Sequence, residues 1–228
     1  MIQMIKKTFA LLLVAVVLAS ACISGGAVFK KKYGDYDINF RADLNLADKV
    51  PVYSYREGEV AQSENGISDL TSYIFDKKNY LFYISFLPSE KENGFYAVSG
   101  FELANKMVTA FKRHYKIDKP YIQNTNDGFM CMIFGETIEY DKVLCIKTVP
   151  LNTTDDIENM VNSTAGKSVI FLKGPEAGAT ETSVIVDSRG IITLQGKDFS
   201  EDKRTFTDLD LAVDKFVTAL LDTPPEGN

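Results

Sequence analysis

Residues 1–22 constrain this chain more than any other stretch, because they decide in which compartment the rest of the chain folds. Lys6 and Lys7 form a short basic segment, Phe9–Leu18 is an unbroken apolar run, and the small residues Ala19-Ser20-Ala21 follow. This order of segments is the anatomy of an export signal. The apolar run is shorter than the roughly 20 residues that a helix needs to span a bilayer. The sequence therefore predicts that residues 1–21 are a signal peptide and that the remaining chain is exported.

The segment Leu18-Ala19-Ser20-Ala21-Cys22 resembles the lipobox of bacterial and archaeal lipoproteins. The resemblance implies cleavage before Cys22, attachment of lipid such as palmitate to Cys22, and anchoring on the extracytoplasmic side of the cell membrane. It implies no functional family for the mature domain. Two alternatives stay open: ordinary signal peptidase cleavage after Ala21, which releases the protein, and an uncleaved signal anchor within the uncharged stretch 8–29. We favour the lipoprotein, because neither alternative explains a cysteine at position 22.

The composition of the chain after the signal limits its possible partners and its number of domains. Removal of residues 1–21 takes away two lysines, so 25 − 2 = 23 basic residues face 31 acidic ones, a formal charge of −8. This charge argues against a nucleic-acid partner. We expect a tether at residues 22–35, where Lys30-Lys31-Lys32 would lie near lipid headgroups, and one globular domain at 36–228. An arrangement of that domain in two lobes that meet near Pro120 stays open.

Apolar periodicity predicts an α+β domain with a mainly antiparallel sheet and two to three helices packed on one side of it. Strands are expected at 50–55 on a sheet edge, at 71–75 and 80–87 as a hairpin with a central second strand, at 128–134 and 142–148 as a second hairpin, and at 169–172, 183–186 and 191–194. Helices are expected at 99–115, capped by Ser99 and Glu102, at 155–161, and at 209–221, capped by Thr207 or Asp208.

The two remaining cysteines, Cys131 and Cys145, fall in the second predicted hairpin. With the turn centred on Ile138, the two residues lie directly opposite each other, at a spacing that a disulfide can bridge. An oxidising compartment favours the bond, whereas two buried free thiols are the alternative. In the same exported region Asn152 and Asn162 begin glycosylation sequons.

The sequence contains no complete motif for a metal or a cofactor. Residues 35–39 begin like a calcium loop, but Phe40 and Leu46 replace its glycine and its glutamate. The glycines at 174–178 lack the third glycine of a dinucleotide fingerprint, so we interpret the stretch as a turn. His114 is the one histidine, which excludes a multi-histidine zinc site, and we expect it to have a role at the helix surface or helix end rather than in catalysis.

Two classes of function follow. The first is a non-catalytic binding or envelope-interaction module, with the lipid bilayer and an unidentified protein or small molecule as partners. The second is an extracytoplasmic hydrolase that works with carboxylates, for which the candidates are Glu136, Glu139 and Asp141, or Asp208, Asp210 and Asp214. Asp210 and Asp214 stand one helical turn apart beside Lys215, a pattern that is also typical of a solvated helix face.

Overall fold

The protein is described from a computed structural model, which covers residues 29–56, 59–61, 66–76, 79–135, 142–162, 167–187, 189–199 and 206–226. The predicted signal peptide and Cys22 lie outside these residues. The helices are α2 (Leu44–Ala47), α3 (Gly66–Ile74), α4 (Asn93–Tyr115), α5 (Asp155–Asn162) and α6 (Asp208–Asp222). The strands are β1 (Phe29–Tyr33), β2 (Tyr36–Phe40), β3 (Val52–Arg56), β4 (Glu59–Ala61), β5 (Leu81–Phe86), β6 (Tyr121–Asn124), β7 (Met130–Ile133), β8 (Val143–Pro150), β9 (Lys167–Lys173), β10 (Ser183–Asp187) and β11 (Ile191–Gln195).

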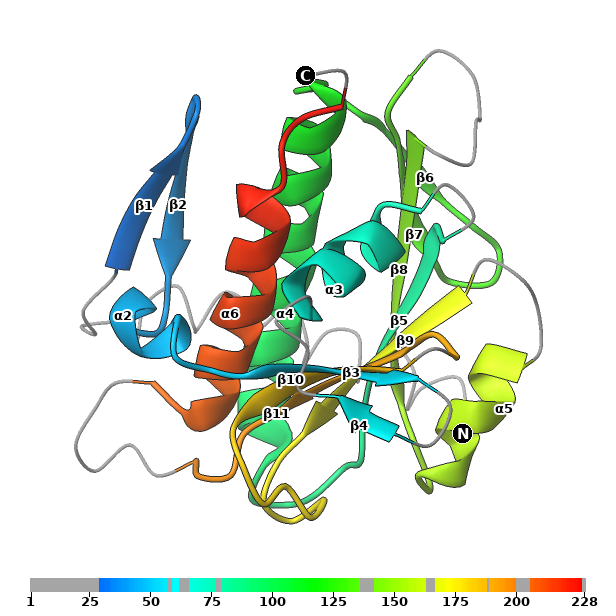
Figure 1. Ribbon diagram of the computed structural model, residues 1–228. Helices are drawn as coiled ribbons and strands as arrows, with labels where there is room; N and C mark the ends of the chain where they lie inside the picture. Colours follow the sequence, from blue (N-terminus) through cyan, green and yellow to red (C-terminus); the bar gives the residue numbers. More distant parts are fainter. Residues whose placement is uncertain are drawn as a thin grey trace.

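The α+β class is confirmed, and a 9-stranded mixed sheet forms the centre of the molecule (Figure 1). Its strand order is β4-β3-β10-β11-β9-β5-β8-β7-β6. The prediction of a mainly antiparallel sheet is only partly correct, because β11, β9, β5 and β8 run parallel to one another, as do β3 and β10. Helices separate some of these strands, since α4 follows β5 and α5 connects β8 to β9. Strands β9 and β11 are parallel because β10, which runs in the opposite direction, lies between them in the chain.

Strand β5 is central, as predicted, with β9 and β8 as its neighbours. The expected hairpin before it is wrong, because Gly66–Ile74 is a helix. Leu70 and Ile74 are both fully buried one helical turn apart, a spacing that satisfies the helical period. Strand β3 is also not an edge strand, because β4 lies outside it.

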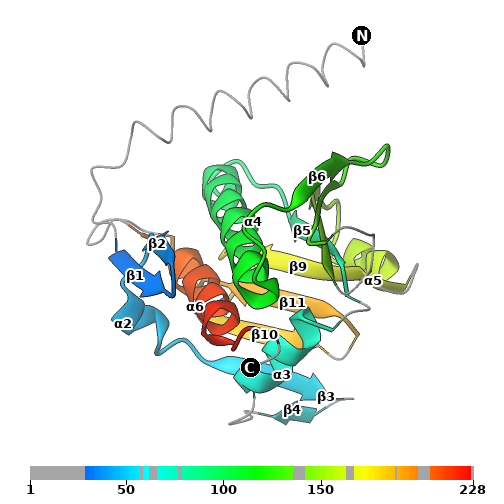
Figure 2. The same ribbon diagram turned by 90° about the horizontal axis from the view of Figure 1, so that it is seen from above.

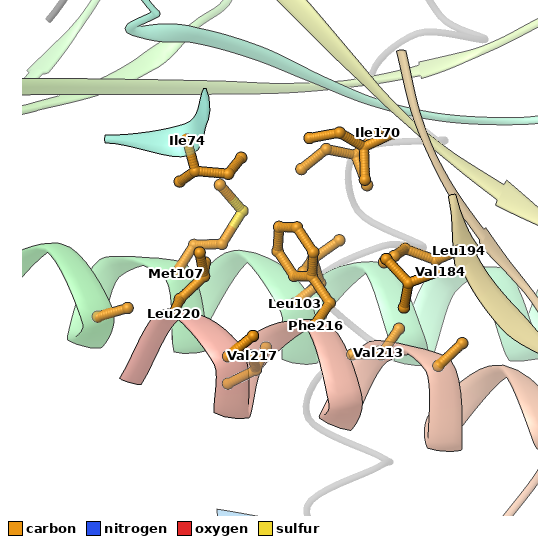
Figure 3. Packing of buried hydrophobic residues seen from close by; sticks show 14 of the residues in the cluster. Ile74, Leu103, Met107, Ile170, Val184, Leu194, Val213, Phe216, Val217 and Leu220 are labelled. Atoms are coloured by element: carbon orange, nitrogen blue, oxygen red, sulfur yellow. The ribbon is translucent and has the colours of Figure 1, made fainter. Parts of the chain in front are cut away.

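Helices cover both faces of the sheet rather than one (Figure 2). On one face α3, α4 and α6 enclose the main core, in which Ile170 and Leu194 of the sheet meet Leu103 of α4 and Phe216 of α6 (Figure 3). On the other face α5 covers Val169 and Phe171. Adjacent residues of β9 therefore point into different cores, because successive side chains of a strand alternate between faces.

A third layer lies outside the helices, where the β1–β2 hairpin and α2 pack beside α6 (Figure 1). Tyr33 and Phe40 of this hairpin are buried in the main core. The predicted tether at 22–35 is therefore too long, since the chain already forms a strand at Phe29. The hairpin and α2 cover the outer side of α6, and most residues of this helix are buried.

Helix α4 begins six residues before the predicted start, at Asn93 instead of residue 99. Ser99 is therefore not a cap but a buried residue within the helix, with 1% of its surface exposed. The predicted helix at 209–221 is confirmed as α6, and Thr207 is its N-cap in a capping box with Asp210. The predicted short helix at 155–161 and the three strands between Lys167 and Gln195 are likewise confirmed.

Candidate functional site

A cavity of about 300 Å³ lies beside the first turns of α4. Lys91, Gly94, Phe95 and Val98 line it from the start of α4, together with Ser99, Arg41 from the segment after β2, and Asp210 from the first turn of α6. Since α4 follows β5, the cavity lies near the carboxyl ends of the parallel strands, on the face of the sheet that α4 and α6 cover. This edge of an α/β sheet is where ligands are usually bound.

Asp210 is the buried acid of the cavity lining, with 3% of its surface exposed. Its Oδ1 accepts hydrogen bonds from Arg41 Nε at 3.3 Å and Ser99 Oγ at 3.1 Å. Its Oδ2 accepts from the backbone N–H of Thr207 at 2.9 Å and from Thr207 Oγ1 at 3.0 Å. Both carboxylate oxygens are thus fully used by the protein, and Asp210 positions Arg41 rather than offering a lone pair to a ligand.

Arg41 is half-buried, with 32% of its side chain exposed. Only its Nε contacts Asp210, and within the described part of the chain neither terminal Nη nitrogen has a protein partner. A guanidinium keeps its charge at any physiological pH and presents its donors in a planar fork. Among the described residues, the cavity therefore contains a cation that Asp210 holds in place and whose terminal N–H donors have no protein partner.

Glu92 follows the lining residue Lys91 in the chain and is also buried. Tyr96 Oη donates to Glu92 Oε2 at 2.5 Å, and the backbone N–H groups of Gly174 and Glu176 donate to Tyr96 Oη and Glu92 Oε1 at 3.0 and 2.8 Å. These bonds fix the turn after β9, and Lys91 pairs with Glu176 across it at 3.2 Å. Burial, reinforced by the bond to Glu92, raises the pKa of Tyr96, so this tyrosine stays neutral.

The stretch at 174–178 is a turn, as predicted, with Gly178 at a positive φ of 83°. A side chain at Gly174 would meet Glu92 and Tyr96, because a Cβ there would lie 2.5 Å and 2.7 Å from their oxygens. This glycine therefore serves close packing, and its N–H is already used within the protein.

A second buried charge cluster lies further along α4 and α6. Lys106 Nζ contacts Asp214 Oδ1 at 2.8 Å and Glu102 at 3.2 Å, and it lies 4.9 Å from the ring centroid of Phe40. The other oxygen of Asp214 accepts the backbone N–H of Ala42 at 2.8 Å. Burial raises the pKa of Asp214, against the opposing effect of Lys106. The cluster joins α4, α6 and the hairpin layer.

The acids proposed for a hydrolase have different outcomes. Asp208, Asp210 and Asp214 are all buried, so the interpretation of Asp210 and Asp214 as a solvated face is wrong. Asp208 accepts a hydrogen bond from Thr182 Oγ1 at 2.7 Å. Sequence reasoning missed their partners Arg41, Ser99 and Lys106, because each lies more than 100 positions away along the chain. Glu136, Glu139 and Asp141 lie outside the described residues.

His114 lies in the last turn of α4 and is partly buried. Its ring stacks on Phe75 with the centroids 4.0 Å apart, and its Nδ1 lies 3.3 Å from the carbonyl oxygen of Pro224. Burial lowers the pKa of His114, so the ring acts as a neutral stacking partner and not as a positive charge at the helix end.

The second predicted hairpin is confirmed, with Cys131 directly opposite Cys145 in the β7–β8 register. In the structure a disulfide joins these residues across a Cα–Cα distance of 4.0 Å. Asn152 and Asn162 of the two sequons are both exposed. Among the described residues no three His, Cys, Asp or Glu side chains gather closely enough to hold a metal ion. No described helix is both long and apolar enough to cross a bilayer.

Comparison of the chain with models of protein families, with curated proteins and with solved structures gives no match.

Proposed function

We propose that this chain is a lipid-anchored binding module on the extracytoplasmic side of the cell membrane, and that its ligand enters the cavity beside Arg41. The observation that carries the binding role is the position of the Arg41 guanidinium at the cavity. Asp210, whose oxygens already accept hydrogen bonds from Ser99 and Thr207, holds the Nε of Arg41, and the terminal nitrogens of Arg41 have no partner within the described residues. The protein thus maintains a charged, oriented donor at the surface, which supports recognition of a ligand.

The signal anatomy before Cys22 supports the lipid anchor. The disulfide across β7 and β8 supports export of the chain, because such bonds persist in oxidising compartments. Phe29 follows Cys22 by 29 − 22 = 7 residues, so the first strand can lie at most about 25 Å from the anchor. Lys30 and Lys32 are exposed on that strand and would face the headgroups, where each adds about 1 kcal/mol of attraction to an anionic surface.

The anchor is tested by intact-mass measurement and detergent partitioning of the protein expressed with its own leader. We expect a mature chain that begins at Cys22, carries lipid and enters the detergent phase. Because one acyl chain binds membranes only marginally, stable anchoring requires about two chains or the help of the lysines in β1. The Cys22→Ser variant should stay unprocessed or be released, while Cys131→Ser should partition like the unaltered protein. A retained Met1 or an unmodified Cys22 would refute the lipoprotein.

The carboxylate-dependent hydrolase stays a prediction for Glu136, Glu139 and Asp141. For Asp210 and Asp214 the hydrogen bonds already described give a structural role, since their oxygens hold α4, α6 and the hairpin layer together.

A further inference from the structure

We propose that the cavity beside Arg41 binds a small organic monoanion, in which one carboxylate is attached to a short apolar or aromatic group. This inference rests on the proposed binding function and adds the chemical class of the ligand.

The carboxylate follows from the geometry of Arg41. Asp210 takes only the Nε of the guanidinium, which leaves the two terminal nitrogens to donate in parallel. Two parallel N–H donors match the two oxygens of a carboxylate, and such bidentate pairs are short and strong. Because Ser99 and Thr207 hold Asp210 in turn, the guanidinium loses little conformational freedom when the ligand binds.

The apolar part follows from the cavity wall. Phe95 and Val98 stand one turn apart in α4 and are both partly buried at the cavity. Phe95 is held by Phe199, whose ring centroid lies 5.1 Å away in an edge-on arrangement. Apart from the backbone of α4 itself, no atom of the described residues lies within 4 Å of the position that a Cβ would take at Gly94, so the described structure leaves space beside this wall. Covering these side chains with an apolar group adds binding free energy in proportion to the area removed from water.

The balance of charges around the cavity argues against a ligand that carries several negative charges. Asp210 balances Arg41, and Glu176 lies 3.2 Å from Lys91, so the two cations are offset by two acids. Lys91 is 85% exposed, and its surface pair is therefore weak enough for the ammonium to approach a ligand instead. With no surplus of positive charge among these groups, a polyphosphate or another multiply charged anion is disfavoured.

The size of the cavity sets the size of the ligand. Its volume of about 300 Å³ is at the lower end of the range of small-molecule sites. A carboxylate with a benzyl group or a short alkyl chain fits this description, whereas a large cofactor does not.

The experiment measures binding by calorimetry to the mature full-length chain in lipid nanodiscs, with empty nanodiscs as the blank. The probes are benzoate, phenylacetate and hexanoate, and each has its neutral amide as a control of nearly the same shape. We expect saturable binding of at least one carboxylate with one site per chain, and binding of its amide at least about tenfold weaker, because the amide cannot form the charge-assisted pair with Arg41.

Variants locate the binding in the cavity. Arg41→Gln should weaken the carboxylate at least about tenfold and leave the amide unchanged, and Arg41→Lys should give an intermediate loss, because lysine retains the charge but not the fork. Gly94→Leu should abolish binding of both probes by filling the open space, whereas Gly94→Ala should retain it. Arg189→Gln is the matched control, since Arg189 also pairs with carboxylates but does not line this cavity. Circular dichroism shows whether each variant folds, and Gly94→Leu tests the site without altering Arg41.

Several results would overturn the proposal. Equal affinity for acid and amide, no binding of any of the three carboxylates, or binding that survives both Arg41→Gln and Gly94→Leu would each refute it, as would tighter competitive binding of inorganic phosphate. If only the amides bind and Gly94→Leu blocks them, the ligand class is wrong while the binding function stands. The lipid on Cys22 is measured separately, so its absence would refute the anchor without affecting the ligand.

Discussion

At the scale of single residues, the partners of the charged side chains decide their roles. Lys106 and Asp214 have 5% and 1% of their surfaces exposed, which is unusual for a lysine and an aspartate. Each is tolerated in the interior because it meets the other at 2.8 Å and has a further partner, Glu102 for the lysine and the N–H of Ala42 for the aspartate. Neither residue can lose its partner without leaving a buried charge.

Replacement of Lys106 by Met should therefore lower the free energy of unfolding by about 3–5 kcal/mol, because Asp214 remains buried without its countercharge. The double variant Lys106→Met/Asp214→Asn should lose less than the sum of the two single variants, since asparagine can still accept the N–H of Ala42. Urea denaturation monitored by circular dichroism gives all four values of the cycle. Additive losses would show that the two side chains do not interact in the folded protein.

His114 should make stability depend on pH. Its pKa in the folded protein is lowered by burial below the ordinary value of 6.5. As the pH falls below about 6.5, the unfolded chain takes up a proton at His114 that the folded chain does not, so stability is lost through that window.

The variant His114→Phe retains the ring that stacks on Phe75 but cannot be protonated. Thermal unfolding at pH 7.5 and pH 5.5 should therefore show a smaller drop in Tm for this variant than for the unaltered protein. The comparison between the two proteins removes the contribution of the acidic residues, which titrate in both. Equal drops would mean that the imidazole is protonated as easily in the folded chain as in the unfolded one.

At the scale of elements, α6 shows how a helix can look amphipathic and still be buried. Its apolar residues Val213, Phe216 and Leu220 face the sheet and α4 (Figure 3), and the β1–β2 hairpin and α2 cover its outer side. The acids on that outer side are consequently buried as well. The sequence predicts the helix and its Thr207 cap correctly, because both depend on neighbouring residues.

The β7–β8 hairpin is closed by a disulfide between its two strands. The Cys131–Cys145 bond closes a short loop with a sequence separation of 14, and by the chain-entropy model it stabilises the fold by about 3 kcal/mol. The unreduced, denatured protein should therefore show no reactive thiol from these residues, and a reduced sample should show two. The Cys131→Ala/Cys145→Ala variant should unfold at correspondingly lower urea concentration. Two reactive thiols before reduction would show that the bond does not form.

At the scale of the whole molecule, the N-terminal hairpin covers part of the main core. A chain that begins at Tyr36 lacks β1 and leaves part of the main core uncovered, because Tyr33 is 5% exposed and Phe29 packs on Phe206 with the centroids 6.2 Å apart. Each buried aromatic side chain contributes about 1.5–3 kcal/mol. We expect a chain that begins at Phe29 to be more stable by at least one such contribution.

Thermal unfolding of the two purified chains measures the difference, with an identical short leader on both. A third chain that begins at Phe29 and carries Tyr33→Ala should behave like the shorter one if burial of the aromatic ring is the cause. Equal Tm values for the chains that begin at Phe29 and Tyr36 would support the longer tether that the sequence predicts.

Errors in the sequence-based interpretation share one physical origin. The sequence predicts a strand at 71–75, because β-branched and aromatic residues favour strands by local propensity, but most of this stretch belongs to the helix Gly66–Ile74. Burial of Leu70 and Ile74 against the main core outweighs that preference. In the same way, nothing near Arg41 or Ser99 in the sequence indicates that they meet at Asp210, so the cavity could not be predicted.

The sequence by itself determined what depends on neighbours along the chain: the α6 cap, the β7–β8 register and the central position of β5. Only the tertiary structure decided the parallel pairing of β5 with β8 and β9, the covering of α6, and the meeting of Arg41 with Asp210. The physical reason is the range of the interactions. Caps and hairpin registers are fixed by contacts within a few residues, whereas strand order and buried ion pairs are fixed by the packing of segments that are far apart in the chain.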